Sequence, residues 1–203
     1  MKQLYREQFD RNSERGKHLC NEYVERVLQM DAAEIQHEFI YVDEAGFNLA
    51  KTRRRGRNVI GHRAITNVPG QRGGNITLGA AITQNGVLHH HANLGPYNPN
   101  LILAFLDRLH EIVTALNQVD QMRYIVVWDN VSFHRAALVQ NWFHEHPEFE
   151  VLYLPPYSPL PESNRFFSAW RWKVYNLRPY DGLPLIQAME QACDHIEAAS
   201  VQG

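Results

Sequence analysis

Two short runs of aromatic and β-branched residues stand out along the chain, because each one ends in an acid. Residues 39–42 lead into Asp43, and residues 124–128 lead into Asp129. An unbroken apolar run of this length predicts a strand that is buried in a sheet. A carboxylate at the end of a buried strand is costly unless a metal ion, a cationic partner or hydrogen-bond donors compensate its charge. Both acids are therefore candidate metal ligands. The alternatives are that Asp129 caps the following helix and that Asp43 pairs with a nearby arginine.

The rest of the pattern predicts a mixed α/β sheet. An Asn85-Gly86 pair predicts a hairpin, and further strands are expected at residues 58–69, 75–83, 87–93 and 149–154. Apolar residues recur at helical spacing in four segments: residues 100–116 after a cap at Asn100, residues 136–144, a segment from about 163, and a segment from 185. The order indicates an antiparallel meander followed by parallel strands with crossover helices.

Residues 1–37 are polar and helix-prone, with a short apolar stripe at Tyr23, Val24, Val27 and Leu28. We expect a helical arm or linker here, followed by one domain over residues 38–203. No apolar run approaches the roughly 18 residues that a membrane span needs, so no membrane partner is expected. The two cysteines, Cys20 and Cys193, give neither a disulfide framework nor a zinc spacing.

A net charge of −2 means that binding to nucleic acid would have to depend on local basic patches. The densest patch places five cations in seven residues: Lys51, Arg53, Arg54, Arg55 and Arg57. The alternative for this patch is a solvated loop without a partner. The triplet His89-His90-His91 lies on a predicted strand, where alternation puts His89 and His91 on one face. No nearby cysteine or acid completes a metal site, so we expect a half-exposed strand.

Three motifs occur in an order that is specific as a set. They are Tyr41-Val-Asp-Glu44, then Val127-Trp-Asp-Asn130 with His134, then Leu154-Pro-Pro-Tyr-Ser-Pro159. Together they resemble the DDE domain of mariner-type transposases and of bacterial insertion-sequence transposases, over roughly residues 38–178. The resemblance implies a ribonuclease H-like fold: a mixed sheet in which a three-stranded antiparallel meander precedes parallel strands with flanking helices.

The resemblance also implies a function, namely metal-dependent cleavage and strand transfer of DNA in transposition. Asp43 and Asp129 would then be the first two ligands of a two-metal site, with a third acid from a later helix. Carboxylates suit Mg²⁺ or Mn²⁺, and two such ions activate the attacking oxygen and stabilise the leaving one. The implied partners are transposon ends and target DNA, with a homodimer as a further expectation.

The third acid is where the chain departs from the family pattern. Counting from the Tyr-Ser-Pro motif, its register falls on Arg165, and counting back from Phe166 it falls on Asn164. Glu162 is the nearest carboxylate. Three alternatives follow: Glu162 is a displaced ligand, Asn164 is a weak neutral ligand, or the site is degenerate. An acid near a helix N-terminus is also favourable without any catalytic duty. We expect impaired catalysis.

A second departure concerns the recognition of DNA. Family members carry helix-turn-helix modules before the catalytic domain, and residues 1–37 are too few for two of them, so a truncated transposase is expected. Unspecific phosphate contacts are expected from the basic patch and from Arg171 and Lys173, whose alternative is a solvated helix face. The competing functions are another ribonuclease H-like nuclease and an inactive remnant that binds DNA or protein. The location would be nuclear in a eukaryote and otherwise cytoplasmic.

Overall fold

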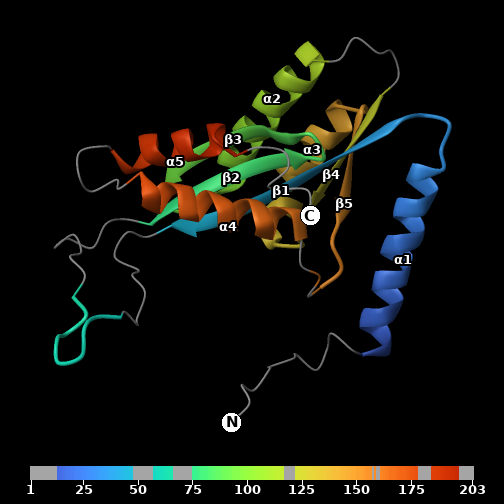
Figure 1. Ribbon diagram of the computed structural model, residues 1–203. Coiled ribbons are helices and arrows are strands. Elements are labelled where there is room, and N and C mark those ends of the chain that lie inside the picture. The colour runs from blue at the N-terminus through green and yellow to red at the C-terminus, as the bar shows by residue number, and fades with distance from the viewer. Residues whose placement is uncertain are drawn as a thin grey trace.

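The computed structural model describes residues 13–47, 57–65, 75–116, 122–156, 158, 161–177 and 184–196. Its centre is one five-stranded sheet with helices on both faces (Figure 1). The strand order is β3-β2-β1-β4-β5. The bounds are β1 His37–Phe47, β2 Ile76–Thr83, β3 Gly86–Leu94, β4 Arg123–Trp128 and β5 Phe149–Tyr153.

Strand directions confirm the predicted mixed sheet. β1, β2 and β3 form an antiparallel meander, whereas β4 runs parallel to β1 and β5 runs parallel to β4. The hairpin at Gly86 is also observed, where φ is 121° and favours glycine. The strand expected at residues 58–69 is wrong for its described part, because residues 58–65 form a turn and irregular chain; residues 66–69 lie outside the described ranges.

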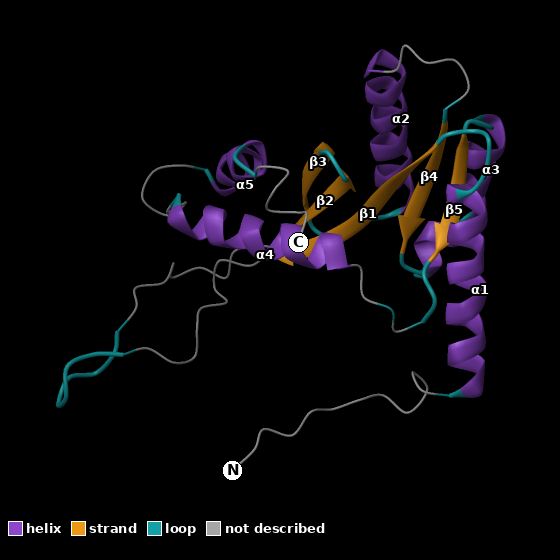
Figure 2. Cartoon of the chain, turned by 45° about the vertical axis from the view of Figure 1, so that its right-hand side comes forward, coloured by secondary structure: helices purple, strands orange, loops and turns teal. Residues whose placement is uncertain are grey.

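Helices cover the two faces of the sheet unequally (Figure 2). Their bounds are α1 Glu14–Asp31, α2 Pro99–Leu116, α3 Ala137–Glu145, α4 Pro161–Asn176 and α5 Leu185–Asp194, with a short 3-10 helix, η2, at Ser132–Arg135. α2 and α3 pack on one face, while α4 and α5 cover the meander on the other face. α1 packs on that second face further along, over β4 and β5. Within the described ranges, no helix has the length and apolar character that crossing a membrane requires.

Alternation along β1 decides which face each functional residue occupies. Ile40 and Val42 belong to the core beneath α2 and α3. Phe39 and Tyr41 contact the opposite core, beneath α1. Since successive side chains of a strand point to opposite faces, Asp43 lies on the α1 and α4 face. Glu44 lies on the α2 and α3 face.

Three local predictions about helices need correction. The cap of α2 is Asn98, not Asn100, because Asn98 Oδ1 accepts a hydrogen bond of 3.0 Å from the backbone N–H of Leu101. α4 begins at Pro161, so Glu162 lies inside its first turn and not before it. In α1, only part of the predicted stripe faces the sheet, since Leu28 is 60% exposed.

Candidate active site

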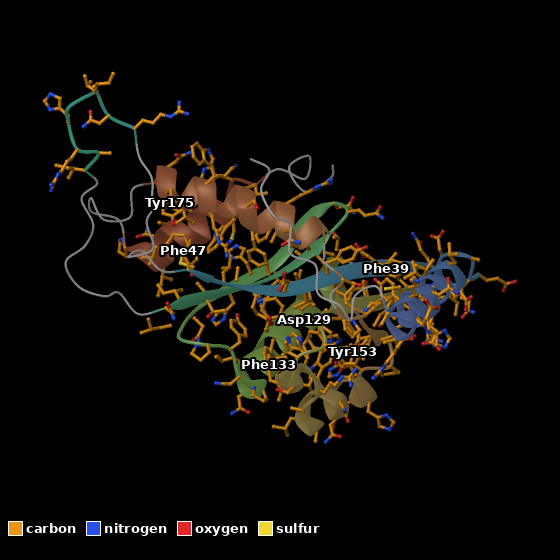
Figure 3. All side chains as sticks on the ribbon, turned by 90° about the horizontal axis from the view of Figure 1, so that it is seen from below. Phe39, Phe47, Asp129, Phe133, Tyr153 and Tyr175 are labelled. Atoms are coloured by element: carbon orange, nitrogen blue, oxygen red, sulfur yellow. The ribbon has the colours of Figure 1, made fainter. Side chains whose placement is uncertain are left out.

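Parallel pairing of β1 with β4 brings Asp43 and Asp129 together. The register pairs Tyr41 with Val127, and each acid lies two residues further along its chain. Asp43 lies within β1, opposite Ala80 of β2, so the first strand does not end before this acid as its apolar run predicts, whereas Asp129 directly follows β4. Continuation of the β1–β4 register places both acids on the same face at the C-terminal end of β4, on neighbouring chains about 4.8 Å apart. Figure 3 shows Asp129 close to β1, near the middle of the sheet.

The pKa of Asp43 records this crowding of acids. Burial raises the pKa of its carboxyl to about 7, and the negative charges of Glu44 and Asp129 raise it further. The backbone N–H of Glu44 donates a hydrogen bond of 2.8 Å to Asp43 Oδ1, and it acts in the opposite direction. A group of acids that repel one another in a partly buried place has the electrostatics of a cation site.

Among the described residues, no donor satisfies one carboxylate oxygen of Asp129. Its Oδ1 is buried and accepts no hydrogen bond from them, although the side chain as a whole is 49% exposed. The capping alternative is wrong, because η2 follows Val131 and has no side-chain cap. A buried carboxylate oxygen without a donor is costly. At the end of β4, Asp129 Oδ1 thus lacks a described hydrogen-bond donor, and it lies 3.0 Å from Nδ1 of His134.

His134 is a buried histidine that lies between Asp129 and Glu44. It belongs to the second sequence motif, which by itself assigns it no role. The His134 side chain is 1% exposed, and its Nε2 lies 3.1 Å from Glu44 Oε1. Its Nδ1 lies 3.1 Å from the carbonyl oxygen of Asp129 and 3.0 Å from Oδ1 of the same residue. Hydrogen-bond geometry is met at the carbonyl, so the contact to Oδ1 is one of charge.

The ionisation of His134 follows from these partners. Burial by itself lowers the pKa of the imidazole, but hydrogen bonds with Asp129 and Glu44, and the Glu44 charge, outweigh it and raise the pKa to about 9. His134 is therefore a cation at neutral pH, between two carboxylates. Strand alternation predicts only that Glu44 faces away from Asp43. The contact of Glu44 with His134 could not be read from the sequence, because the position of His134 depends on the tertiary fold.

α4 crosses the same face of the sheet as the two acids. Phe47, at the end of β1, contacts Trp170 and Tyr175, with ring centroids 5.6 Å and 5.3 Å apart. The C-terminal half of α4 thus lies at the end of β1, and Figures 1 and 2 show its N-terminal end toward β4. This orientation directs the first turn of α4, with Glu162 and Asn164, toward the edge that bears Asp43.

The third ligand is not assembled in the described structure. Asn164 and Arg165 are exposed, and the Glu162 side chain lies outside the described part. Among the described residues, no group of three or more His, Cys, Asp or Glu side chains is arranged to hold a metal ion. The two aspartates lie on neighbouring chains of the sheet, whereas only the backbone of Glu162, the candidate third ligand, is described.

The predicted basic residues fall into two groups. Lys51, Arg53, Arg54 and Arg55 lie outside the described residues. Of the others, Arg57 and Arg171 are exposed and Lys173 is half-buried. Arg171 Nη2 lies 3.5 Å from the carbonyl oxygen of Gly46, so this cation lies over the end of β1.

The three histidines of β3 do not form a shared site. His89 packs against Phe105, with ring centroids 4.6 Å apart, and burial lowers its pKa to about 4. His91 Nδ1 lies 2.9 Å from the Tyr97 hydroxyl. His90 Nε2 lies 3.5 Å from Asp194. The strand is half-exposed, as expected.

Comparisons with known proteins converge on one family. A family model described as DDE superfamily endonuclease matches residues 38–181. The chain is similar to the crystal structure of a pre-cleavage Mos1 transpososome, with a TM-score of 0.71 and 18% identity over 99% of this chain and 61% of that chain. It is also similar to the Mos1 mariner paired end complex with Mn, with a TM-score of 0.69 and 20% identity over 99% of this chain and 61% of that one.

A shorter relative defines which part is shared. The crystal structure of the catalytic domain of Mos1 mariner transposase matches with a TM-score of 0.63 and 18% identity, covering 98% of this chain and 89% of that chain. The chain thus spans about three fifths of the longer Mos1 chains and most of the catalytic domain. These likenesses confirm the ribonuclease H-like fold. No curated protein sequence matches the chain.

Proposed function

The chain belongs to the DDE superfamily endonuclease family, and on that premise we propose that the edge bearing Asp43 and Asp129 is a metal-dependent site for cleaving and joining DNA strands. One observation carries the proposal. Two acids far apart in sequence lie on neighbouring chains of the sheet, Asp43 within β1 and Asp129 directly after β4, with the Asp43 pKa raised to about 7 by burial, Glu44 and Asp129. Capping of the following helix does not explain the position of Asp129, because η2 has no side-chain cap.

The residues fit divalent cations. Asp129 Oδ1 is a buried carboxylate oxygen without a hydrogen-bond donor. Hard oxygen donors of this kind suit Mg²⁺ and Mn²⁺. Binding a cation would offset the burial and the repulsion that together raise the Asp43 pKa. Solved structures of Mos1 paired end complexes contain Mn in one case and Mg in another, which supports the same choice for this chain.

Each residue would have a defined duty. Asp43 and Asp129 would hold the cations, which when bound polarise a phosphodiester and activate the attacking oxygen. The rigid β1–β4 pair fixes the two carboxylates relative to each other. Glu162, in the first turn of α4, is the candidate third ligand, and Asn164 is the neutral substitute.

We infer weakened catalysis from the third position. Asn164 and Arg165 occupy the two registers in which the family pattern has an acid, and both are exposed. A neutral amide contributes less charge than a carboxylate to a second cation, and a nearby guanidinium opposes it. The site should therefore bind its second metal poorly and cut slowly.

DNA is the proposed substrate and partner. Arg57 and Arg171 are exposed cations, and Arg171 lies over the end of β1 on the α4 side. Contacts of this type give affinity that falls with salt and ignores sequence. One similar structure is named as a Mos1 transposase paired-end complex with the left transposon end, and another as the Mos1 strand transfer complex, which supports DNA as the partner here.

A nicking assay tests the proposal. Supercoiled plasmid and Mn²⁺ should yield nicked circles with the unaltered chain and none with Asp129→Ala. Glu111→Ala is the matched control, since Glu111 is an exposed acid of α2 that pairs with Arg108. Nicking that survives Asp129→Ala would refute the assignment.

The second candidate function is DNA binding without cleavage. The absence of an acid at Asn164 and Arg165 favours it. This second function predicts that the unaltered chain binds DNA with an affinity that falls as the salt concentration rises. It also predicts that no nicked circles form with Mg²⁺ or with Mn²⁺. Asn164→Glu separates the two, because restored nicking would identify the missing ligand.

A further inference from the structure

We propose that the buried Glu44–His134 pair is a positioning device that aims the Asp129 carboxylate at Asp43. His134 reaches β1 through Nε2, 3.1 Å from Glu44 Oε1. It reaches Asp129 through Nδ1, 3.1 Å from the carbonyl oxygen. One imidazole thus joins the strand of one candidate ligand to the loop of the other. The consequence for metal binding rests on the proposed function, whereas the consequence for the Asp129 side chain does not.

Asp129 needs such support because its strand has already ended. The last ladder pair of β4 is Trp128 with Tyr153, and the backbone N–H of Leu154 donates to the Trp128 carbonyl at 3.0 Å. Among the described residues, no strand pairing of β4 continues beyond Trp128. The hydrogen bond from His134 to the Asp129 carbonyl replaces the missing ladder, and the direction of the carboxylate follows from the backbone it fixes.

The imidazole is itself held rigidly. It stacks on Trp128, with ring centroids 4.3 Å apart and an interplanar angle of 4°. Phe133 contacts it edge-on at 4.3 Å. The Tyr153 hydroxyl donates a hydrogen bond of 3.1 Å to the His134 carbonyl, and Figure 3 shows Phe133 and Tyr153 beside Asp129. Trp128 of β4 and Phe133 of η2 pack against the imidazole and restrict its orientation. A residue that positions another side chain needs such support.

Glu44 links the Glu44–His134 pair to Asp43. It follows Asp43 directly on β1 and points to the opposite face of the sheet. A movement of Glu44 therefore moves the backbone that carries Asp43. Because His134 holds both Glu44 and Asp129, the two candidate ligands share one support, and their separation is set by it.

Two substitutions at His134 each keep one of its two contacts and remove the other. His134→Asn places an amide N–H near the position of Nδ1, so it keeps the contact with Asp129 and loses the contact with Glu44. His134→Gln reaches the position of Nε2, so it keeps Glu44 and loses Asp129. A purely structural role predicts the same outcome for both, since each removes one buried partner.

The chain also has a matched control pair. His110 Nε2 lies 3.0 Å from Glu148 Oε1, and the ring packs edge-on against Trp142 and Phe149. This is a histidine–glutamate pair among aromatic side chains, but Glu148 precedes β5 and lies at the opposite end of the strands from Asp129. His110→Ala therefore costs stability without touching the candidate site.

The experiment measures Mn²⁺ affinity of the full chain by calorimetry and the melting temperature of each variant without metal. His134→Ala and His134→Gln should weaken Mn²⁺ binding by about 10–100-fold, and His134→Asn should weaken it far less. His110→Ala should lower the melting temperature and leave the affinity unchanged. Equal affinities for the Asn and Gln variants, or an unchanged affinity in His134→Ala, would overturn the proposal.

A second measurement keeps the two proposals separate. The side-chain carboxyl ¹³C resonance of Asp129, assigned by its loss in Asp129→Asn, should shift in both His134→Gln and His134→Asn without any metal, because both remove the imidazolium charge 3.0 Å from Oδ1. It should shift further in His134→Gln than in His134→Asn, because only the Asn variant keeps an N–H near the position of Nδ1. Equal shifts in the two variants would overturn the positioning role. If the unaltered chain binds no Mn²⁺ but this pattern holds, the metal function fails and the positioning role stands. If the resonance ignores both substitutions, the positioning role fails.

Discussion

Asp43 and Glu44 are neighbours on β1, yet they face opposite sides of the sheet and meet different partners. Asp43 is crowded by acids at the open edge, whereas Glu44 contacts the buried His134. Strand alternation produces this division directly. One strand thus presents a candidate metal ligand on one face and its support on the other.

Asp43→Asn should raise stability in the absence of metal while abolishing Mn²⁺-dependent nicking. The folded-state pKa of Asp43 is raised from 3.8 to about 7, so its ionisation costs stability as pH rises through that window, and the cost is complete above about pH 7. We expect the melting temperature in EDTA at pH 8 to rise by about 2–4 °C, equivalent to about 1 kcal/mol, with little gain at pH 4. A lower melting temperature for Asp43→Asn at pH 8 would contradict this account of its environment.

His89→Leu should remove part of the sensitivity of the fold to acid. Burial against Phe105 lowers the pKa of His89 from 6.5 to about 4, and the charges of His90, His91 and Arg108 add to the shift. Its neutral form therefore contributes stability above pH 6.5 that is lost as pH falls toward 4. Urea unfolding should show the unaltered chain losing about 1–2 kcal/mol more than His89→Leu between pH 7 and pH 5. The exposed His62, replaced by leucine, is the control and should leave the loss unchanged.

Met30 and Leu28 on α1 should respond very differently to truncation. Met30 is 6% exposed and packs against Ile125, Val127 and Leu154, whereas Leu28 is 60% exposed. Met30→Ala should cost about 2–3 kcal/mol, and Leu28→Ala less than about 0.5 kcal/mol, in chemical denaturation. Equal costs would mean that α1 does not pack on the sheet as described.

Gly79→Ala should destabilise the meander through Tyr97. A Cβ at position 79 would lie 2.7 Å from the Tyr97 hydroxyl oxygen, and that hydroxyl donates to the His91 carbonyl at 2.9 Å. The rigid ring must move and its hydrogen bonds must break, at a cost of about 1–3 kcal/mol. Gly46→Ala is the matched control, because no atom of the described residues lies within 4 Å of its added Cβ. A Gly79→Ala variant as stable as Gly46→Ala would contradict the packing of Tyr97.

Much of the sheet could be predicted from the sequence, because its central strands are runs of aromatic and β-branched residues that leave little choice. The failed strand at residues 58–65 shows the limit. Val59 and Ile60 are β-branched, but both are exposed, and Asn58 forms a local turn by donating to the Arg63 carbonyl at 2.8 Å. Local hydrogen bonding by asparagine competes with strand pairing.

The two aspartates and the Glu44–His134 contact also differ in how far they could be predicted from the sequence. Asp129 follows β4 and Asp43 lies within β1, and both strands have a strong apolar pattern, so the proximity of the two acids could be anticipated from parallel pairing. The Glu44–His134 contact could not, because it joins β1 to a short 3-10 helix whose position only the packing of Trp128 and Phe133 defines. The start of α4 at Pro161 was missed, although proline is favoured at the first helical position.

The central claim is that Asp43 and Asp129 belong to one metal site, and a double-mutant cycle tests it most directly. Mn²⁺ affinity would be measured by calorimetry for the unaltered chain, Asp43→Asn, Asp129→Asn and the double variant. Ligands of a shared site are coupled, so the double variant should bind scarcely more weakly than either single one, with a coupling of at least about 1 kcal/mol. Effects on the free energy of binding that simply add, within about 0.5 kcal/mol, would show that the two carboxylates act separately and would contradict the shared site.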